Sequence, residues 1–310
     1  MNSAIRTVLT TIAICSLLPA WTINAQTDQT DQPLRWKLKQ GEKLSVLLEQ
    51  NTGVKTMLGN REQETGNEML MTLQWNVTSA ANNEFVIEQT IERIQLTINA
   101  PSENGIQTTK LDTSEEEGTG KLAEHLLQQI RPLIGTVHSI TMNDRGEISD
   151  VSIPKDSKEA IRQAPSSMQI RQIVSEDGIK EMIGQGAIVF PSESISSGDD
   201  WSEQKTVQNG LGEITTTTKF TYNGPQEIDG GKVEQFSASI LMTSDAKKLK
   251  EGVKISGFDG KGKIMFAAEA KNVLATEFSN QLTTKRNYRE TIIESTVTTE
   301  TKTKVTRDDG

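Results

Sequence analysis

The chain has 310 residues, a formal net charge of −9 and a single cysteine; 34% of its residues are hydrophobic and only 4% are aromatic. This composition is too apolar for a fully disordered chain and too polar for a membrane protein with many spans. The acidic balance argues against a general nucleic-acid binder, because such a protein needs a basic face to neutralise phosphates. The length allows a sizeable core in one large domain or two ordinary ones.

Residues 1–25 are typical of a secretory signal peptide. Arg6 is their only charge, and the mostly apolar run Val8–Leu18 is too short to span a bilayer. Pro19 ends this run, and we expect cleavage between Ala25 and Gln26. A buried first helix and an uncleaved membrane anchor are the alternatives.

The single cysteine lies inside this segment. Cys15 follows Ile14, whereas a lipoprotein signal needs a small residue before the cysteine that carries lipid. Cleavage after Ala25 leaves a mature chain without cysteine, which excludes a thiol nucleophile, a cysteine-based zinc site and an iron–sulfur cluster. We therefore expect an exported protein of a bacterial cell envelope, periplasmic or extracellular, with no membrane span after cleavage.

After the signal peptide we expect three parts. Residues 26–33 form a polar, disordered linker, 34–306 form a single β-rich domain with a helical insert at about 119–185, and 307–310 form a tail. Early in the domain, apolar residues recur at every second position, which is typical of strands with one buried face. They are Leu44, Val46 and Leu48, followed by Met69, Met71, Leu73, Trp75 and Val77.

The next strand, Phe85–Ile98, changes phase along its length. Phe85, Ile87 and Ile91 occupy odd-numbered positions, whereas Ile94, Leu96 and Ile98 occupy even-numbered ones. An extra residue near Glu92-Arg93 restores the inward face, which indicates a β-bulge. A strand that crosses between two packing partners explains the pattern equally well.

The insert has a helical pattern. Thr119–Ile134 has apolar residues at helical spacing: Leu122, Leu126, Leu127, Ile130, Leu133 and Ile134. A hairpin follows, with strands at 137–142 and 147–153 around the turn Asn143–Gly146. Capping boxes predict short helices at about 156–164 and 166–174, and a third is expected at about 176–185.

Strand patterns dominate again from Trp201 to the end. The expected strands are 202–209, 212–223, 231–243, 261–270, 271–286 and 288–306. The glycine-containing turns between them are Asn209-Gly210, Asn223-Gly224-Pro225, Asp229-Gly230-Gly231 and Asp259-Gly260. The last strand is rich in threonine, which favours strands and tolerates water, although this run is also compatible with fraying or a linker.

The order of strands, helices and strands predicts an α+β, β-rich fold. We expect a large, curved, antiparallel sheet of half-barrel shape, with the helical insert in the middle of the chain. Such a sheet is expected to wrap the helices on its concave side.

Residues suited to catalysis are sparse. His125 lies at the border of a helical apolar face, His138 shares a strand face with Ile140, and neither has a carboxylate or second histidine at ligand spacing. A Gly-x-Ser-x-Gly motif is absent, and Gly257–Lys263 lacks the P-loop ending and is interpreted as a hairpin turn. We therefore predict no catalytic, cofactor-binding or metal-binding residues, and no enzyme activity.

Three short segments carry a resemblance. They are Trp36–Lys43 with its Gly-Glu-Lys ending, Met142–Ile148, and Phe190-Pro191 followed by Ser197-Gly198-Asp199-Asp200-Trp201. This layout resembles an uncharacterised family of exported bacterial proteins, a domain of unknown function, over most of 34–306. The family implies no site residues. At the level of fold alone, the β-meander with inserted helices is similar to the LolA-like carriers of lipoproteins and lipids.

Two functions follow as hypotheses. In the first, a non-catalytic envelope protein binds an apolar ligand or a lipid-linked partner on its curved sheet. In the alternative, the protein is a structural or protein-interaction module of the envelope that uses exposed threonine-rich strands. An exported hydrolase is a third and weaker hypothesis, which a cleft holding a histidine beside a carboxylate would favour.

Overall fold

A computed structural model describes residues 33–308 except 103–104, 164–174, 177, 181–187, 210, 229–230 and 289–290. The expected signal peptide and its cleavage site at Ala25 and Gln26 lie outside the described residues. The same holds for the expected helix at 166–174 and for most of the one at 176–185. No helix within the described ranges has the length and apolar character needed to cross a membrane.

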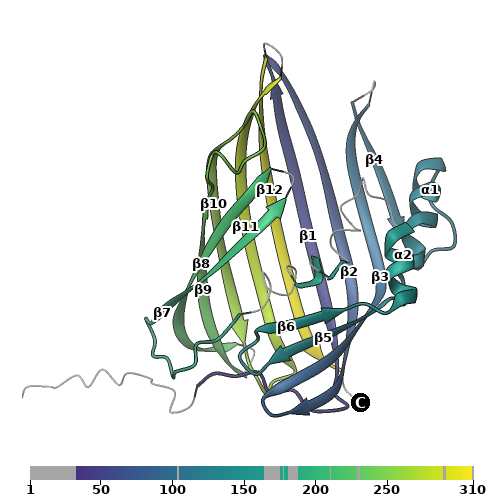
Figure 1. Ribbon diagram of the computed structural model, residues 1–310. Helices are drawn as coiled ribbons and strands as arrows, with labels where there is room; N and C mark the ends of the chain where they lie inside the picture. The colour runs from purple at the N-terminus through teal and green to yellow at the C-terminus, as the bar shows by residue number, and fades with distance from the viewer. Residues whose placement is uncertain are drawn as a thin grey trace, which may run out of the picture.

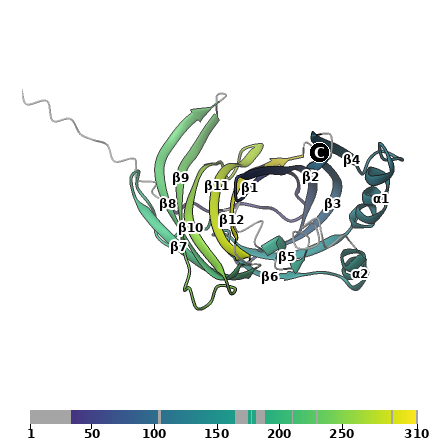
Figure 2. The same cartoon turned by 90° about the horizontal axis from the view of Figure 1, so that it is seen from above.

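The described residues form an antiparallel sheet of 12 strands, which confirms the predicted β-rich fold class (Figure 1). The first half contains β1 (Lys43–Leu58), β2 (Arg61–Ala81), β3 (Glu84–Ser102), β4 (Gly105–Asp112), β5 (Val137–Asn143) and β6 (Ile148–Ser152). The second contains β7 (Asp200–Asn209), β8 (Gly212–Ile228), β9 (Gly231–Thr243), β10 (Val253–Phe266), β11 (Asn272–Tyr288) and β12 (Thr291–Arg307). The strand order is β6-β5-β3-β2-β1-β12-β11-β10-β9-β8-β7, with β4 paired to β3, and the sheet is strongly curved (Figure 2).

The first two helices of the insert do not lie on the concave side of the sheet, where the sequence led us to expect them, whereas Ile179, in the helix expected at about 176–185, is buried in the inner-face core. α1 (Lys121–Ile130), the 3₁₀ turn η1 (Arg131–Leu133) and α2 (Lys155–Gln163) lie at the flank of the sheet beside β3 and β4 (Figures 1 and 2). The helix expected at 119–134 ends at Ile130, because Pro132 cannot continue the α-helical hydrogen bonds and the chain forms the 3₁₀ turn η1 instead. Leu122, which was assigned to the apolar face, is exposed.

The predicted bulge in β3 is confirmed and has a clear role. Arg93 pairs with Thr72 and Ile91 with Leu73, so Glu92 is the extra residue. Before the bulge, Glu84–Thr90 of β3 pairs with β5. After the bulge, Gln95–Ser102 of β3 pairs with β4. The bulge is therefore the point where β3 exchanges one neighbour for another, and α1 lies against β4 at this fork.

An ion pair between the exposed Arg93 and the largely buried Asp112 holds the fork together. The Arg93 guanidinium donates to both carboxylate oxygens of Asp112, and Gln95 and the backbone of Ser114 donate to the same carboxylate. Hydrogen bonds from Arg93 hold the pKa of Asp112 well below its usual range, and those from Ser114 act in the same direction.

Several glycine-containing turns predicted in the second half are wrong. Gly257–Lys263 lies inside β10, because Gly262 leaves space for the Phe278 ring of β11 and a Cβ there would overlap that ring. Asn223-Gly224-Pro225 lies inside β8, where Gly224 has φ +91° and the pairing shifts by one residue. The hairpin between β5 and β6 and the strand 231–243 are confirmed.

β12 pairs with β1 and β11 along its length and continues through Arg307, which the sequence placed in the tail. The Arg307 guanidinium contacts Glu42 and donates to the carbonyls of Lys37 and Ala268, which lie near opposite ends of the chain. The threonine-rich run is therefore a strand in the middle of the sheet.

One face of the sheet, which we call the inner face, carries the core. Its buried residues include the predicted ones in β1 and β2, and an aromatic cluster joins them. The cluster consists of Trp36, Phe190, Trp201, Phe220, Tyr222, Phe236 and Phe266. Ile179, in the insert, is also fully buried in this core. The core occupies only the half of the sheet nearest β5 and β6.

Replacing Asp112 with Asn tests the ion pair at the fork. The depressed pKa of Asp112 stabilises the fold above the unfolded-state pKa of about 3.9, and this contribution is lost as the pH falls below it. Asp112→Asn should lower the free energy of unfolding by roughly 1–2 kcal/mol at neutral pH, measured by urea denaturation.

The difference between the native protein and Asp112→Asn should shrink below about pH 4. Glu116→Gln, which changes an exposed carboxylate in the same loop, is the matched control and should have little effect. A difference that stays constant into the acid range would contradict the assignment of the ion pair.

Candidate functional site

The inner face extends well beyond the core. Directly paired residues of neighbouring antiparallel strands share a face, so the register of β2, β1, β12, β11 and β10 defines rows that cross the sheet. We call the part from Gln50 to the tip of β1, with its neighbours in those strands, the open half. The labelled helices α1 and α2 do not cover it (Figures 1 and 2).

The first rows of the open half are polar in β1 and β12, while Met69 and Phe278 in the Gln50 row still belong to the core. Gln50, Thr52 and Asn67 line β1 and β2, opposite Thr299 and Thr301 of β12. In β11 of the same rows, the Oδ1 atom of Asn280 is buried without a partner among the described residues. These side chains separate the core from the rest of the face.

Beyond them lies an apolar row. Val54 pairs with Val297, Val297 with Leu282, and Leu282 with Phe258, so these four side chains lie side by side across β1, β12, β11 and β10. All four are half-buried. A row of aligned, partly exposed apolar side chains is a surface that loses water when an apolar molecule covers it.

The last inner-face row forms the rim of the sheet. It consists of Val253, Arg286, Ile293, Leu58 and Arg61, in that order across β10, β11, β12, β1 and β2. Leu58 is 48% exposed, so its side chain is accessible at this rim.

The outer face of the same region has a depression of about 240 Å³. Its floor is the cross-strand pair of Gly53 and Gly66, whose lack of side chains leaves the space. Glu68 and Glu300 are among the residues that line it. Its chemistry is polar and acidic, in contrast to the apolar row on the inner face.

The two histidines do not meet. His125 is exposed on α1 and contacts Gln129. His138 is fully buried in a row with Gln89 and Trp75, whose indole N–H donates to the Gln89 side chain at 2.8 Å. The Lys158 ammonium lies 3.0 Å from the Glu176 carboxylate and lowers its pKa. Among the described residues, no group of His, Cys, Asp and Glu is arranged to hold a metal ion.

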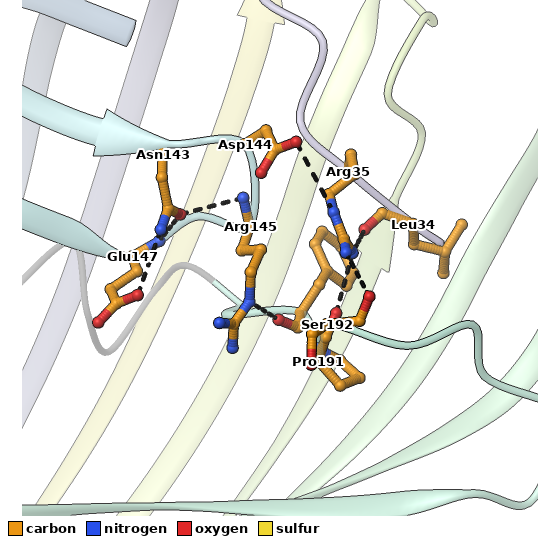
Figure 3. A network of polar contacts seen from close by, with 9 residues as sticks. Leu34, Arg35, Asn143, Asp144, Arg145, Glu147, Pro191 and Ser192 are labelled. Carbon is orange, nitrogen blue, oxygen red and sulfur yellow. Dashed lines mark hydrogen bonds and ion pairs between the residues drawn. The ribbon is translucent and has the colours of Figure 1, made fainter. Parts of the chain in front are cut away.

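The three segments that carry the sequence resemblance meet at one junction (Figure 3). The Trp36 amide donates to the Asp144 carbonyl at 2.7 Å, and the Phe190 amide donates to the Arg145 carbonyl at 2.9 Å. Arg35 donates to the carbonyls of Pro191 and Ser192. These contacts therefore attach the β5–β6 turn to the segment that precedes β1 and to the segment that precedes β7.

The rest of this junction is also structural. Within the turn, the Asn143 side chain accepts from the amides of Arg145 and Glu147. The Trp201 indole donates to the Val189 carbonyl at 3.0 Å. Burial raises the pKa of Glu203 on β7, and the nearby Glu147 carboxylate raises it further, so β7 lies close to the β5–β6 turn. The junction joins the two ends of the strand order and keeps the sheet curved.

Sequence reasoning missed the inner-face rows. The alternation that buries Leu44, Val46 and Leu48 continues to Val54 and Leu58 on the same face, so the signal was present in β1. The alignment of these residues with β11 and β12 depends on register between strands that are distant in sequence, and no local pattern specifies it.

Comparison with known proteins identifies a family. The model of a family of unknown function, DUF6263, matches residues 82–272. The match includes the Met142–Ile148 turn and the Phe190–Trp201 segment, and it confirms the expected resemblance over that range, while Trp36–Lys43 lies outside it. No curated protein matches the chain.

Similarity to solved structures is weak. The chain resembles a structure described as showing lipid–protein interactions in lipovitellin, with 12% identity and a TM-score of 0.43, covering 88% of this chain but 26% of that one. It thus spans about a quarter of that chain. An outer membrane channel from Pseudomonas putida F1 has 6% identity and a TM-score of 0.24 over 89% of this chain and all of its own. Similarities at this level do not bear on function.

Replacing Gly146 with Ala tests the junction. Gly146 has φ +92°, and a Cβ there would lie 2.6 Å from the Ile188 carbonyl oxygen and 2.7 Å from the Trp36 indole nitrogen. We expect Gly146→Ala to lower the free energy of unfolding by about 2–4 kcal/mol in urea denaturation.

Gly41→Ala is the matched control, because Gly41 has a similar φ of +84° and open space at its Cβ position. It should cost only about 1 kcal/mol, from backbone strain alone. Equal losses for the two variants would contradict tight packing at the junction.

Proposed function

The chain belongs to the DUF6263 family of unknown function, and from this premise we propose that it is an exported, non-catalytic envelope protein that binds an apolar ligand on its inner face. The ligand is a free apolar molecule or the apolar part of a lipid-linked partner. The binding surface is the open half, centred on Val54, Val297, Leu282 and Phe258.

The observation that carries this proposal is the half-exposed apolar row. Elsewhere on the inner face, large apolar side chains such as Leu73 and Phe266 are fully buried in the core. Val54, Val297, Leu282 and Phe258 instead stay partly in contact with water, although they are aligned across four strands. Covering such a row with an apolar chain gains roughly 25 cal/mol for each Å² removed from water.

The threonines around the row also suit a ligand-binding face. Thr56 and Ser295 contact each other through their hydroxyls at 3.3 Å in the row between the apolar row and the rim. A hydroxyl that already has a partner tolerates both water and an apolar neighbour. The inner face can therefore be in contact with water when no ligand is bound and be covered by an apolar ligand when one is bound.

A non-catalytic role agrees with the positions of the histidines. His125 lies on the exposed side of α1, and His138 is enclosed by the core, so neither lies on the open half. General acid–base chemistry requires such a group within reach of a bound molecule. The apolar row has only hydroxyl, amide and aliphatic groups next to it in β1 and β12.

Export to the cell envelope is supported by the sequence of residues 1–25 and by the absence of cysteine after them. A mature chain of this length needs no disulfide, because its core is large enough. Purification of the native protein from the envelope fraction, with N-terminal sequencing beginning at Gln26, would test both the location and the cleavage site.

An interaction module is the second candidate, because part of a long strand inside the strand order lacks a partner on one side, in addition to the edges of β4, β6 and β7 among the described strands. β10 pairs with β9 only from Gly260 to Phe266, while Val253–Asp259 has no partner on that side among the described strands. An exposed edge of this kind can accept an added strand from another chain. Capture of a partner that is lost when Ser256 is changed to Pro would favour this function.

Changing the apolar row tests ligand binding directly. The probe is methyl parinarate, a neutral polyene ester whose fluorescence rises in an apolar environment. The double variant Val54→Asn, Val297→Asn should bind it at least about tenfold more weakly than the native protein, since each valine contributes on the order of 1 kcal/mol.

The matched control is the double variant Thr296→Asn, Thr298→Asn, whose residues flank Val297 on the outer face. It should bind the probe as the native protein does. Both double variants should keep the native far-UV circular dichroism, because the changed side chains lie outside the core. Equal binding by all three proteins would contradict the proposed site.

A further inference from the structure

We propose that the ligand is an anionic amphiphile: its charged group binds at the rim between Arg61 and Arg286, and its apolar chain runs along the inner face toward the core. This inference rests on the proposed function and adds the chemical class of the ligand. The recognised group is a carboxylate or a phosphate, because both accept hydrogen bonds from guanidinium groups.

The rim row brings two arginines to the same face as the apolar row. Arg61 pairs with Leu58, Leu58 with Ile293, and Ile293 with Arg286, so the two arginines flank a pair of apolar side chains. Neither guanidinium makes an ion pair or side-chain hydrogen bond that involves a described residue, and both side chains are exposed. Among the described residues, therefore, no group competes with a ligand for their donors.

Acidic residues are confined to the other face. Among the described positions of β2, β1, β12, β11 and β10, the inner face carries no Asp or Glu. The outer face of the same strands carries the following: Glu49, Glu62, Glu64, Glu68, Asp259, Glu277, Glu294 and Glu300. In a chain of net charge −9, this separation leaves the inner face of the open half positive.

The nearby lysines behave differently from the arginines. Lys55 on the outer face pairs with Glu62 at 2.7 Å, and Lys285 on the outer face pairs with Glu294 at 2.8 Å. Each of these cations is neutralised by a neighbouring carboxylate. On the inner face of the open half, Arg61 and Arg286 share their face with no carboxylate among the described residues of these strands, which is an arrangement that selects an anion.

The spacing of the rows suits an acyl chain. Leu58 in the rim and Val54 in the apolar row are four residues apart in one strand, which corresponds to about 13 Å. One leaflet of a bilayer has a hydrocarbon thickness of about 15 Å, half of the whole hydrocarbon core. A chain of that length held at the rim by its charged end therefore covers the apolar row.

Three ligands with the same chain and different headgroups test this inference. Dodecanoate, dodecyl phosphate and the neutral dodecanol would each displace methyl parinarate from the native protein. Both anions should bind about tenfold more tightly than dodecanol, which corresponds to roughly 1.4 kcal/mol. This preference should fall strongly at an ionic strength of about 1 M, where the screening length is about 3 Å.

The double variant Arg61→Gln, Arg286→Gln should bind all three ligands alike, because the positive charge that favours the two anions is gone. The control is Lys55→Gln, Lys285→Gln, which removes the same charge from the outer face of β1 and β11 and should keep the preference for anions. The relative affinities of dodecanoate and dodecyl phosphate identify which anionic group the rim prefers.

The outcomes separate this inference from the function on which it rests. Equal affinities of the native protein for all three ligands would overturn the inference and leave apolar binding intact. A preference for anions that survives in the arginine double variant would also overturn it. Failure of methyl parinarate and dodecanol to bind the native protein at all would instead overturn the proposed function.

Discussion

The continuous antiparallel register from β2 through β1 and β12 to β11 is the constraint on which the other features depend. Because paired residues share a face, this register gathers Val54, Val297 and Leu282 into one row and places the acidic residues on the opposite face. A slip of one residue in β1 would turn Lys55 inward and Val54 outward, and the row would be lost. The burial of Leu44, Val46 and Leu48 in the core fixes the register against such a slip, so the core half specifies the chemistry of the open half.

The core half also gives the sheet its curvature. The junction of Trp36, the β5–β6 turn and the Phe190 segment connects strands from the two ends of the strand order. At the opposite side, the bulge at Glu92 lets β3 pair with β5 at one end and β4 at the other. The apolar side chains of the open half thus lie half-exposed on a continuous hydrogen-bonded sheet that the core half holds in place. Rigid support reduces the ordering cost of binding.

Local patterns in the sequence predicted local structure well. Alternation in β2, the bulge near Glu92 and the β5–β6 hairpin all appear in the structure, because each depends on neighbours within one or two strands. The glycines of β10 were misread as a turn, since the ring of Phe278 that requires Gly262 comes from another strand. Leu122 fitted the helical period and is nevertheless exposed, because only part of the helix face meets β4. The candidate site depends on the register between β1, β11 and β12, and no local pattern in the sequence specifies how these distant strands align.

The central claim is that the inner face of the open half is a binding surface for an amphiphile. A crystal structure of the full chain grown with dodecyl phosphate tests it most directly. We predict electron density for the alkyl chain along Val54, Val297 and Leu282, with the phosphate between Arg61 and Arg286. Density confined to the outer face, for example in the depression over Gly53 and Gly66, would contradict this account, as would an inner face that holds only water.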